Sequence, residues 1–250
     1  MMENIKNDRF PSLSKYPLWK FIYTGINDGL FNMACDAYLL DKIIDENNNI
    51  PILRLYGWDK KTLSIGFNQS VNNDYDQSVL SKYPLVRRIS GGQAVLHDDA
   101  LDELTYSVFL YSANDFKKIY FEIGEILRFY LQEYFSLNTS FGYTKENYFK
   151  NFNCFDSKTC ADIVVSDTKV IGSAQYRKKS AILQHGSIKL NLIRNLSDLG
   201  RDSSNAYQNL KECFQKILNI NFVDFKLLDA DYEKINKSKQ LFEVISYSMK

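Results

Sequence analysis

The stretch that most constrains the fold is residues 162–190, which reads as three strands joined by two short turns. A β-branched run at 163–165 is followed by the turn signal Asp-Thr at 167–168, and polar residues at 178–180 mark the second turn. An ordinary hairpin does not need the small and polar segments within these strands, Gly-Ser-Ala-Gln at 172–175 and Gln-His-Gly-Ser at 184–187. Because glycine lets the backbone approach a ligand closely, we expect a site here.

The two histidines of the chain, His97 and His185, lie in similar sequence surroundings. Ser90-Gly91-Gly92 precedes His97, and Gly186 directly follows His185. Two interpretations are equally favoured: buried histidines with a structural role, or residues that line one pocket from two directions. Arg87-Arg88, just before the two glycines, can bind a phosphate or carboxylate together with backbone N–H groups. The alternative is a hairpin turn with an exposed arginine.

Composition argues against several classes of function. The chain of 250 residues has 31 basic and 30 acidic side chains, so it lacks the basic excess that binds nucleic acid or anionic membranes. The N-terminus has no apolar core of a signal sequence, and no run of about 18 apolar residues occurs. We therefore expect a cytoplasmic protein. The four cysteines form no Cys-x-x-Cys pair, which predicts thiols and no metal site.

Hydrophobic periodicity predicts hairpins alternating with long helices. Residues 1–18 are expected to be a polar lead-in, and residues 19–250 a single domain that ends in a short helical segment. Besides the strands of 162–190, strands are predicted at 19–23, 52–56, 62–66, 85–89, 104–110 and 222–228, and helices at 30–44, 74–81, 114–135, 203–220 and 231–247. The strands at 52–56 and 62–66 look like an antiparallel hairpin. The fold class is α+β, with a mixed, mostly antiparallel sheet flanked by helices.

Residues 87–98 carry a family resemblance. Their sequence, Arg-Arg-Ile-Ser-Gly-Gly-Gln-Ala-Val-Leu-His-Asp, resembles the motif Arg-Arg-x-[Ser/Thr]-Gly-Gly-x-x-Val-x-His-Asp of the lipoyl/biotinyl protein ligase and lipoyl (octanoyl) transferase superfamily. Further matches, in the family's order and spacing, are Asn32-Met33-Ala34, Tyr56-Gly57-Trp58, Gly66 with Gln69, and Lys169 to Gln175. The resemblance spans about residues 19–200. It implies a catalytic domain like that of the biotin and lipoate protein ligases.

Three details resemble the cysteine-dependent octanoyltransferases of Gram-positive type more than the ATP-dependent lipoate–protein ligases. Glu-Leu-Thr-Tyr-Ser at 103–107 stands where ligases have Gly-Asn-x-Asn-Tyr-Ser. Gln-His-Gly-Ser at 184–187 stands where ligases have His-His-Gly-Thr. Cys154-Phe155-Asp156 matches the segment that holds the transferase nucleophile. One departure is the link at 99–102, which is slightly longer than the family pattern.

The resemblance implies an acyltransferase that works without a cofactor. Octanoyl (or lipoyl) would move from octanoyl-acyl carrier protein to a lysine of a lipoyl-domain protein, in lipoate biosynthesis and protein lipoylation. The acceptor would be the glycine cleavage H protein or an acyltransferase subunit of a 2-oxoacid dehydrogenase. Two alternatives stay open. An ATP-dependent ligase would use ATP and Mg, with Lys169 gripping the acyl-adenylate. A degenerate subunit would hold lipoyl domains without chemistry.

Residue roles follow from the same resemblance. Cys154 would be the nucleophile, and Lys169 its cationic neighbour and the base for the incoming lysine. Cys160 is the rival nucleophile, and an inert buried thiol is the other interpretation of Cys154. The backbone at 172–174 is expected to supply oxyanion donors. The residues expected to bind substrate are Arg88, Ser90, Gly91, Gly92, His97, Gly172, Ser173, Ala174, Gln175, His185 and Gly186.

Overall fold

A computed structural model describes residues 9–71, 81–111, 115–142, 162–197 and 205–244. The helix expected at 74–81 lies outside these residues except for its last position. The proposed nucleophile Cys154 and its rival Cys160 also lie outside them. In the described part the strands form two sheets, one of eight strands and one of three.

The larger sheet has the strand order β11-β1-β2-β6-β10-β9-β8-β7. β11 and β2 run parallel to β1, and every other neighbouring pair is antiparallel. The predicted mixed, mostly antiparallel sheet is therefore confirmed. Its strands are β1 (Leu18–Asn27), β2 (Ile52–Trp58), β6 (Glu103–Tyr111), β7 (Ser140–Phe141), β8 (Ile163–Val165), β9 (Thr168–Lys178), β10 (Ala181–Lys189) and β11 (Asn221–Asp224).

The smaller sheet has the order β4-β3-β5 and corrects one prediction. Its strands are β3 (Thr62–Ile65), β4 (Leu85–Arg87) and β5 (Val95–His97). The hairpin expected from 52–56 and 62–66 does not form, because β2 pairs with β1 and β6 while β3 pairs with β4 and β5. The reason lies at Trp58, which extends β2 and is fully buried, with its Nε1 donating to Thr105 Oγ1 at 2.9 Å. The chain leaves the large sheet only after this anchor.

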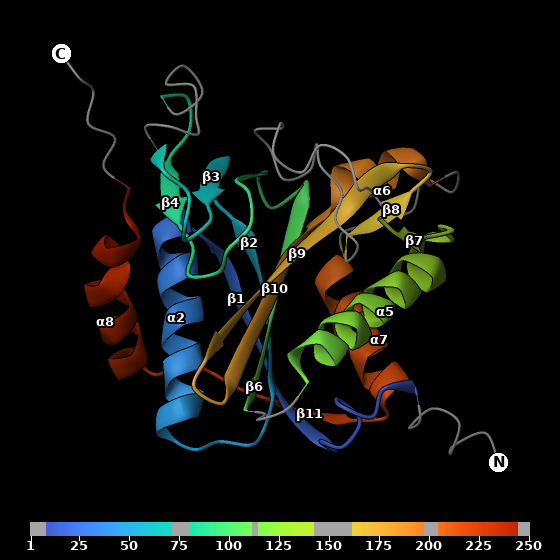
Figure 1. The fold of residues 1–250 in the computed structure, drawn as a ribbon, viewed down its shortest axis with the longest axis horizontal. Helices are drawn as coiled ribbons and strands as arrows, with labels where there is room; N and C mark the ends of the chain where they lie inside the picture. Colours follow the sequence, from blue (N-terminus) through green and yellow to red (C-terminus); the bar gives the residue numbers. More distant parts are fainter. Residues whose placement is uncertain (1–8, 72–80, 112–114, 143–161, 198–204, 245–250) are drawn as a thin grey trace.

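Helices cover both faces of the large sheet (Figure 1). α5 (Phe116–Phe135) and α7 (Ala206–Leu218) lie on one face, while α2 (Gly29–Asp45) and α8 (Asp229–Ser238) lie toward the other. The short helix α6 (Leu190–Leu196) follows β10 directly. The helix expected at 231–247 is shorter: α8 is followed by the 3-10 turn η2 (Lys239–Phe242). α2 begins where the Asp28 side chain accepts the N–H of Phe31 at 2.7 Å, a typical N-cap.

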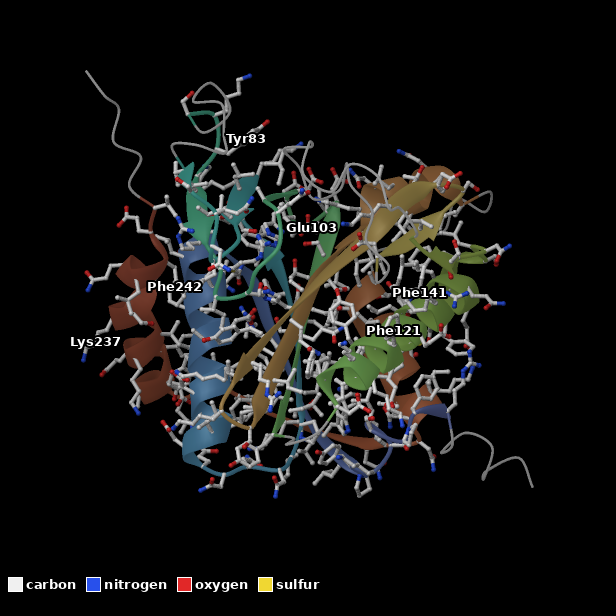
Figure 2. All side chains as sticks on the ribbon, viewed as in Figure 1. Tyr83, Glu103, Phe121, Phe141, Lys237 and Phe242 are labelled. Atoms are coloured by element: carbon white, nitrogen blue, oxygen red, sulfur yellow. The ribbon has the colours of Figure 1, made fainter. Side chains whose placement is uncertain are left out.

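Two hydrophobic cores fill the spaces between sheet and helices. Alternate residues of β6 show the division: Tyr106 and Val108 belong to the core under α5 and α7, and Phe109 belongs to the core under α2. Aromatic contacts continue to the rim, where Phe121 and Phe141 meet edge to face at 5.7 Å (Figure 2). Among the described helices, none has the length and apolar content needed to span a bilayer.

The described part of the lead-in packs against the α5 core. Phe10 and Leu13 are buried. The carboxylate of Glu122, on α5, accepts the backbone N–H groups of Ser12 and Leu13 at 3.0 Å each. Two apolar residues and one carboxylate thus help to fasten a segment whose composition is otherwise polar.

Candidate active site

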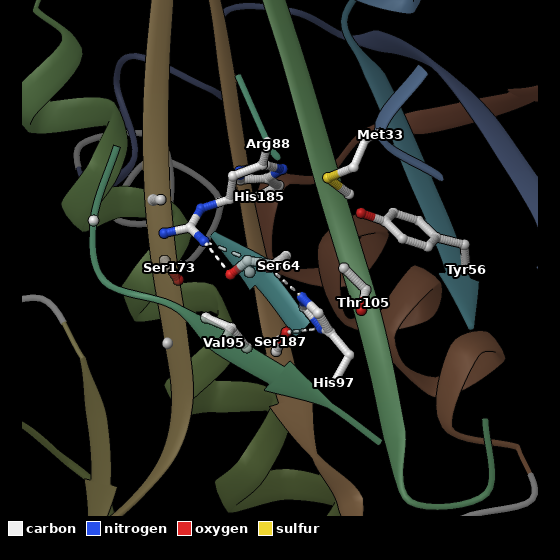
Figure 3. A pocket seen from close by; sticks show the side chains of 14 residues that line it. Met33, Tyr56, Ser64, Arg88, Val95, His97, Thr105, Ser173, His185 and Ser187 are labelled. Carbon is white, nitrogen blue, oxygen red and sulfur yellow. Dashed lines mark hydrogen bonds between the residues drawn. The ribbon is translucent and has the colours of Figure 1, made fainter. Parts of the chain in front are cut away.

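A pocket lies between the two sheets. β9 and β10 form one wall (Figure 3). The small sheet and the loop at 88–94, called the glycine loop below, form the opposite wall, and β2, β6 and α2 close the back. The empty space measures about 460 Å³, counting the part open to solvent. Eight of the residues predicted to bind substrate line it: Arg88, Gly92, His97, Gly172, Ser173, Ala174, His185 and Gly186.

Small residues on β9 make room for the pocket. In the β9–β10 register, Gly172 stands opposite Ser187, and Ala174 stands opposite His185. Residues paired across antiparallel strands project to the same face. The minimal side chains of β9 therefore lie beside the polar side chains of β10. The predicted small-residue segment is part of a regular strand rather than a loop.

The glycine loop packs tightly against Gly66, which directly follows β3. A Cβ placed on Gly66 would lie 2.1 Å from the carbonyl oxygen of Gly92, so no other residue fits at this position. Gly92 itself has φ of +92°, which favours glycine. Arg87 holds the same region together, since its Nη1 donates to the carbonyl oxygens of Gly66, Phe67 and Gln69 at 2.8 to 3.1 Å.

Arg88 clamps the glycine loop from inside. Its Nη2 donates to the carbonyl oxygens of Gly91 and Gln93 at 2.7 Å each. Its Nη1 donates to the Ser64 carbonyl at 2.9 Å, and its Nε to Ser90 Oγ at 3.2 Å. The sequence suggested that this arginine binds an anion or is exposed in a turn. In the structure it is buried and shapes the wall of the pocket.

His185 connects the large sheet to the glycine loop. Its Nδ1 lies 3.0 Å from Asp36 Oδ2 and its Nε2 lies 2.6 Å from Ser90 Oγ. Asp36 is in turn paired with Arg54 at 2.5 Å, and both side chains are almost completely buried. Burial by itself raises the pKa of Asp36, but Arg54 and His185 outweigh it and hold that pKa below its usual range. Since a carboxylate only accepts hydrogen bonds, Nδ1 of His185 carries a hydrogen and donates it to Asp36.

His97 makes the opposite connection, from the small sheet to the large one. Its Nδ1 lies 2.5 Å from Glu103 Oε1, its Nε2 lies 2.8 Å from Ser64 Oγ, and Trp58 stacks on its ring at 3.8 Å. Burial lowers the pKa of His97 in spite of the neighbouring carboxylate. Lys189 contacts the other oxygen of Glu103 at 2.5 Å. The two histidines thus line one pocket and also carry structural hydrogen bonds.

The link at 99–102, longer than the family pattern, leaves this geometry intact. The N–H groups of Asp102 and Glu103 both donate to the Asp99 carbonyl, at 3.0 and 3.1 Å. This turn brings the Glu103 carboxylate within hydrogen-bond distance of His97.

Lys169 is buried in an ion pair. Its Nζ lies 2.9 Å from Asp162 Oδ2, and the two side chains are 0% and 2% exposed. Asp162 is the first described residue after the segment that contains Cys154. Lys169 is not among the described residues that line the pocket. Its ammonium is held near the start of the three-stranded stretch at 162–190.

The remaining predicted residues lie around the pocket rather than in its lining. Ser90 bonds His185, and Gly91 offers its carbonyl to Arg88. Gln175 donates to the Phe116 carbonyl at 3.1 Å and to Gln184 at 3.3 Å. Within the described residues, no cluster of three or more His, Cys, Asp or Glu side chains is placed to hold a metal ion.

The sequence analysis missed the buried charges beneath the pocket, Asp36, Arg54, Glu103 and Lys189. A signal existed. Arg54 lies within the apolar run Ile-Leu-Arg-Leu-Tyr, and a charged residue in such a run requires a buried partner. The spacing alone does not identify that partner, which is 18 positions away on α2.

Comparison with known proteins decides the family. The profile of the lipoyl protein ligase A/B catalytic domain matches residues 28–218. The chain belongs to this family. An octanoyltransferase LipM from Anoxybacillus flavithermus is 40% identical over 192 residues, which is 70% of this chain and 66% of that protein. An octanoyltransferase LipM from Halalkalibacterium halodurans is 31% identical, with 93% of this chain and 99% of that protein covered.

Solved structures agree on the fold. The bi-partite lipoate protein ligase from Thermoplasma acidophilum matches with a TM-score of 0.69 and 18% identity, over 90% of this chain and 93% of that one. The biotin and lipoate ligase fold expected from the motifs is therefore confirmed. As a member of the lipoyl protein ligase A/B family, the chain places its Arg-Arg-x-Ser-Gly-Gly motif in the glycine loop of the pocket.

Proposed function

We propose that this protein transfers an octanoyl group from acyl carrier protein to a specific lysine of lipoyl-domain proteins, through a thioester on Cys154. The observation that carries the proposal is the identity of 31% to 40% with proteins named octanoyltransferase LipM. The segment Cys154-Phe155-Asp156 and Lys169 also match the pattern of the cysteine-dependent transferases. We further propose that the reaction needs neither ATP nor a metal ion.

Two chemical steps account for the transfer. In the first, the Cys154 thiolate attacks the carbonyl carbon of the octanoyl thioester, and the bond to the pantetheine sulfur breaks as that sulfur leaves as a thiolate, which takes up the proton that Cys154 had lost. In the second, the acceptor lysine amine attacks the new thioester, an amide forms, and the cysteine sulfur is released. The amine loses one proton in this step. Splitting one transfer into two steps is the general advantage of a covalent intermediate.

Lys169 supports both steps in this proposal. An ammonium near a thiol stabilises the thiolate, and a lysine that releases its proton can take one from the incoming amine. The ion pair with Asp162, at 2.9 Å, fixes the position of the Lys169 ammonium. Asp162 is therefore a positioning residue for Lys169.

The pocket suits an acyl chain with a polar end. Met33, Tyr56 and Val95 contribute apolar surface, while the histidines and serines supply polar groups at the other walls. Ligand pockets commonly combine an apolar lining with a few placed polar groups.

We also propose the partners and the compartment. The donor is octanoyl-acyl carrier protein, and the acceptor is the glycine cleavage H protein or an acyltransferase subunit of a 2-oxoacid dehydrogenase. Both described cysteines, Cys35 and Cys213, are free and buried, which is typical of reducing compartments such as the cytoplasm.

An experiment separates this activity from that of an ATP-dependent ligase. A purified lipoyl domain is incubated with the protein and either octanoyl-acyl carrier protein without ATP, or free octanoate with ATP and Mg²⁺. We expect octanoylation of the lipoyl domain only in the first mixture. Modification only in the second mixture would mean a ligase, and no modification in either would favour a binding subunit without chemistry.

A further inference from the structure

The two edges of β9 differ beyond Ile171. On one side, β10 pairs with β9 as far as Lys178. On the other side, β8 reaches only Ile171, and no further strand of the described chain continues the pairing. The residues that follow Ile171 toward the pocket, Gly172 to Ala174, therefore have a sheet partner on one edge only.

Tyr120 contacts this strand from α5. Its hydroxyl donates to the backbone carbonyl of Ser173 at 2.6 Å. The carbonyl of Gly172 instead lies toward β10, since a Cβ placed on Gly186 would be 2.5 Å from that oxygen. Successive carbonyls of a strand point to opposite edges, so the two observations agree. The Ser173 carbonyl points away from β10.

The N–H of Ser173 must point the same way. In an antiparallel ladder, the N–H and C=O of one residue face the same neighbour. Gly172 and Ala174 thus direct their N–H groups into the ladder with β10, and Ser173 directs its N–H to the opposite edge. Of the three backbone donors expected at this site, two belong to the sheet. Ser173 alone offers its N–H on the edge where no strand of the described residues pairs with β9, and it lines the pocket.

The surroundings hold Ser173 in this orientation. Its hydroxyl is 2.7 Å from the hydroxyl of Tyr106, which is buried on β6. Gln184 donates to the Tyr120 carbonyl at 3.4 Å, which ties α5 to β10. The strand is therefore fixed through both its side chain and its carbonyl.

We propose that Tyr120 is a positioning residue, which fixes the Ser173 carbonyl and thereby aims the Ser173 N–H as the oxyanion donor for the acyl carbonyl. The inference rests on the octanoyl transfer proposed above. When a thiolate attacks the thioester carbon, a carbon–sulfur bond forms and the carbonyl π electrons move to the oxygen. A preorganised N–H stabilises that negative charge until the leaving thiolate departs.

The first test measures the orientation and does not depend on activity. Amide hydrogen exchange is followed residue by residue by NMR on the ligand-free protein. We expect the Ser173 amide to exchange faster than those of Gly172 and Ala174, because ladder hydrogen bonds protect only the latter two. Equal protection of all three amides would overturn the proposal.

The second test measures the catalytic effect. Losing an oxyanion donor lowers kcat by about 100-fold to 1,000-fold, and losing only its positioning should cost about tenfold. We expect Tyr120→Phe to lower kcat of octanoyl transfer by about tenfold with little change in KM. The matched control is Tyr130→Phe, on the same helix, whose hydroxyl donates to the Ala206 carbonyl at 3.3 Å. An unchanged kcat in Tyr120→Phe, or an equal loss in Tyr130→Phe, would overturn the proposal.

A third measurement distinguishes a failure of this inference from a failure of the proposed transfer. If the wild type transfers no octanoyl group, octanoyl-pantetheine is titrated into the Cys154→Ala protein while the Ser173 amide proton is followed. A downfield shift that is reduced in the Cys154→Ala, Tyr120→Phe double variant supports the donor assignment. The absence of a shift at saturation overturns it.

Discussion

Replacing Asp36 by alanine should strongly destabilise the protein, because it leaves Arg54 buried without its carboxylate. The pair is 2.5 Å apart, with the Arg54 side chain 0% and the Asp36 side chain 2% exposed. Removing one partner of such a pair typically costs about 3–5 kcal/mol. Ser107 also loses an acceptor at 2.8 Å, and His185 one at 3.0 Å. Since total stability is commonly about 5–15 kcal/mol, the loss is a large share of it.

The assay is thermal unfolding followed by circular dichroism, supported by urea titration. For a domain of this size, each kcal/mol shifts Tm by about 2–4 °C, so Asp36→Ala should lower Tm by about 6–20 °C. The control is Asp224→Ala, which breaks a 3.3 Å pair with Lys211 at a side chain that is 76% exposed. Exposed pairs contribute about 0–1 kcal/mol. If Asp36→Ala is no more destabilising than Asp224→Ala, the account of the buried network is wrong.

Three further predictions concern His97, Gly66 and Lys169. Because burial lowers the pKa of His97, the unfolded chain binds a proton there that the folded chain does not. The free energy of unfolding should therefore be highest above about pH 6.5 and should fall, by up to about 1.4 kcal/mol per pH unit, as the pH drops below 6.5. Urea titrations at several pH values should show that the free energy of unfolding depends less on pH in His97→Gln than in the wild type. Gly66→Ala would place a Cβ 2.1 Å from the Gly92 carbonyl and should lower Tm, whereas Gly91→Ala, with nothing within 4 Å, should not; equal Tm values would contradict the close packing. Lys169→Met removes the buried 2.9 Å ion pair with Asp162 and should destabilise the protein by about 3–5 kcal/mol, most of which the double variant Lys169→Met, Asp162→Leu should restore; no recovery in the double variant would contradict the pairing.

Much of the fold was predictable because its elements carry strong local signals. The three strands of 162–190 follow from β-branched runs and turn residues, and the structure has them as β8, β9 and β10. The strand pairing of 52–56 with 62–66 was wrong, because Gly57 and Trp58 belong to β2 and anchor it before the chain turns. The local sequence pattern predicted a strand here, but the burial of Trp58 determines where β2 ends and which strands it pairs with.

The candidate site was only partly predictable. Motif resemblance identified the glycine loop, both histidines and the 172–174 segment, and the structure brings these together at one pocket. Motifs did not identify Tyr120, whose contact with Ser173 joins residues 53 positions apart. A helix residue that bonds a distant strand carbonyl leaves no periodic signal, so only the three-dimensional structure reveals it.

Intact-mass spectrometry of the protein, after mixing with octanoyl-acyl carrier protein in the absence of ATP, tests directly whether Cys154 forms the thioester. We expect an octanoyl adduct on the wild type and on Cys160→Ala, and none on Cys154→Ala. An adduct that persists in Cys154→Ala would move the nucleophile elsewhere. No adduct on the wild type, with lipoyl-domain modification only when ATP and free octanoate are supplied, would contradict the thioester mechanism.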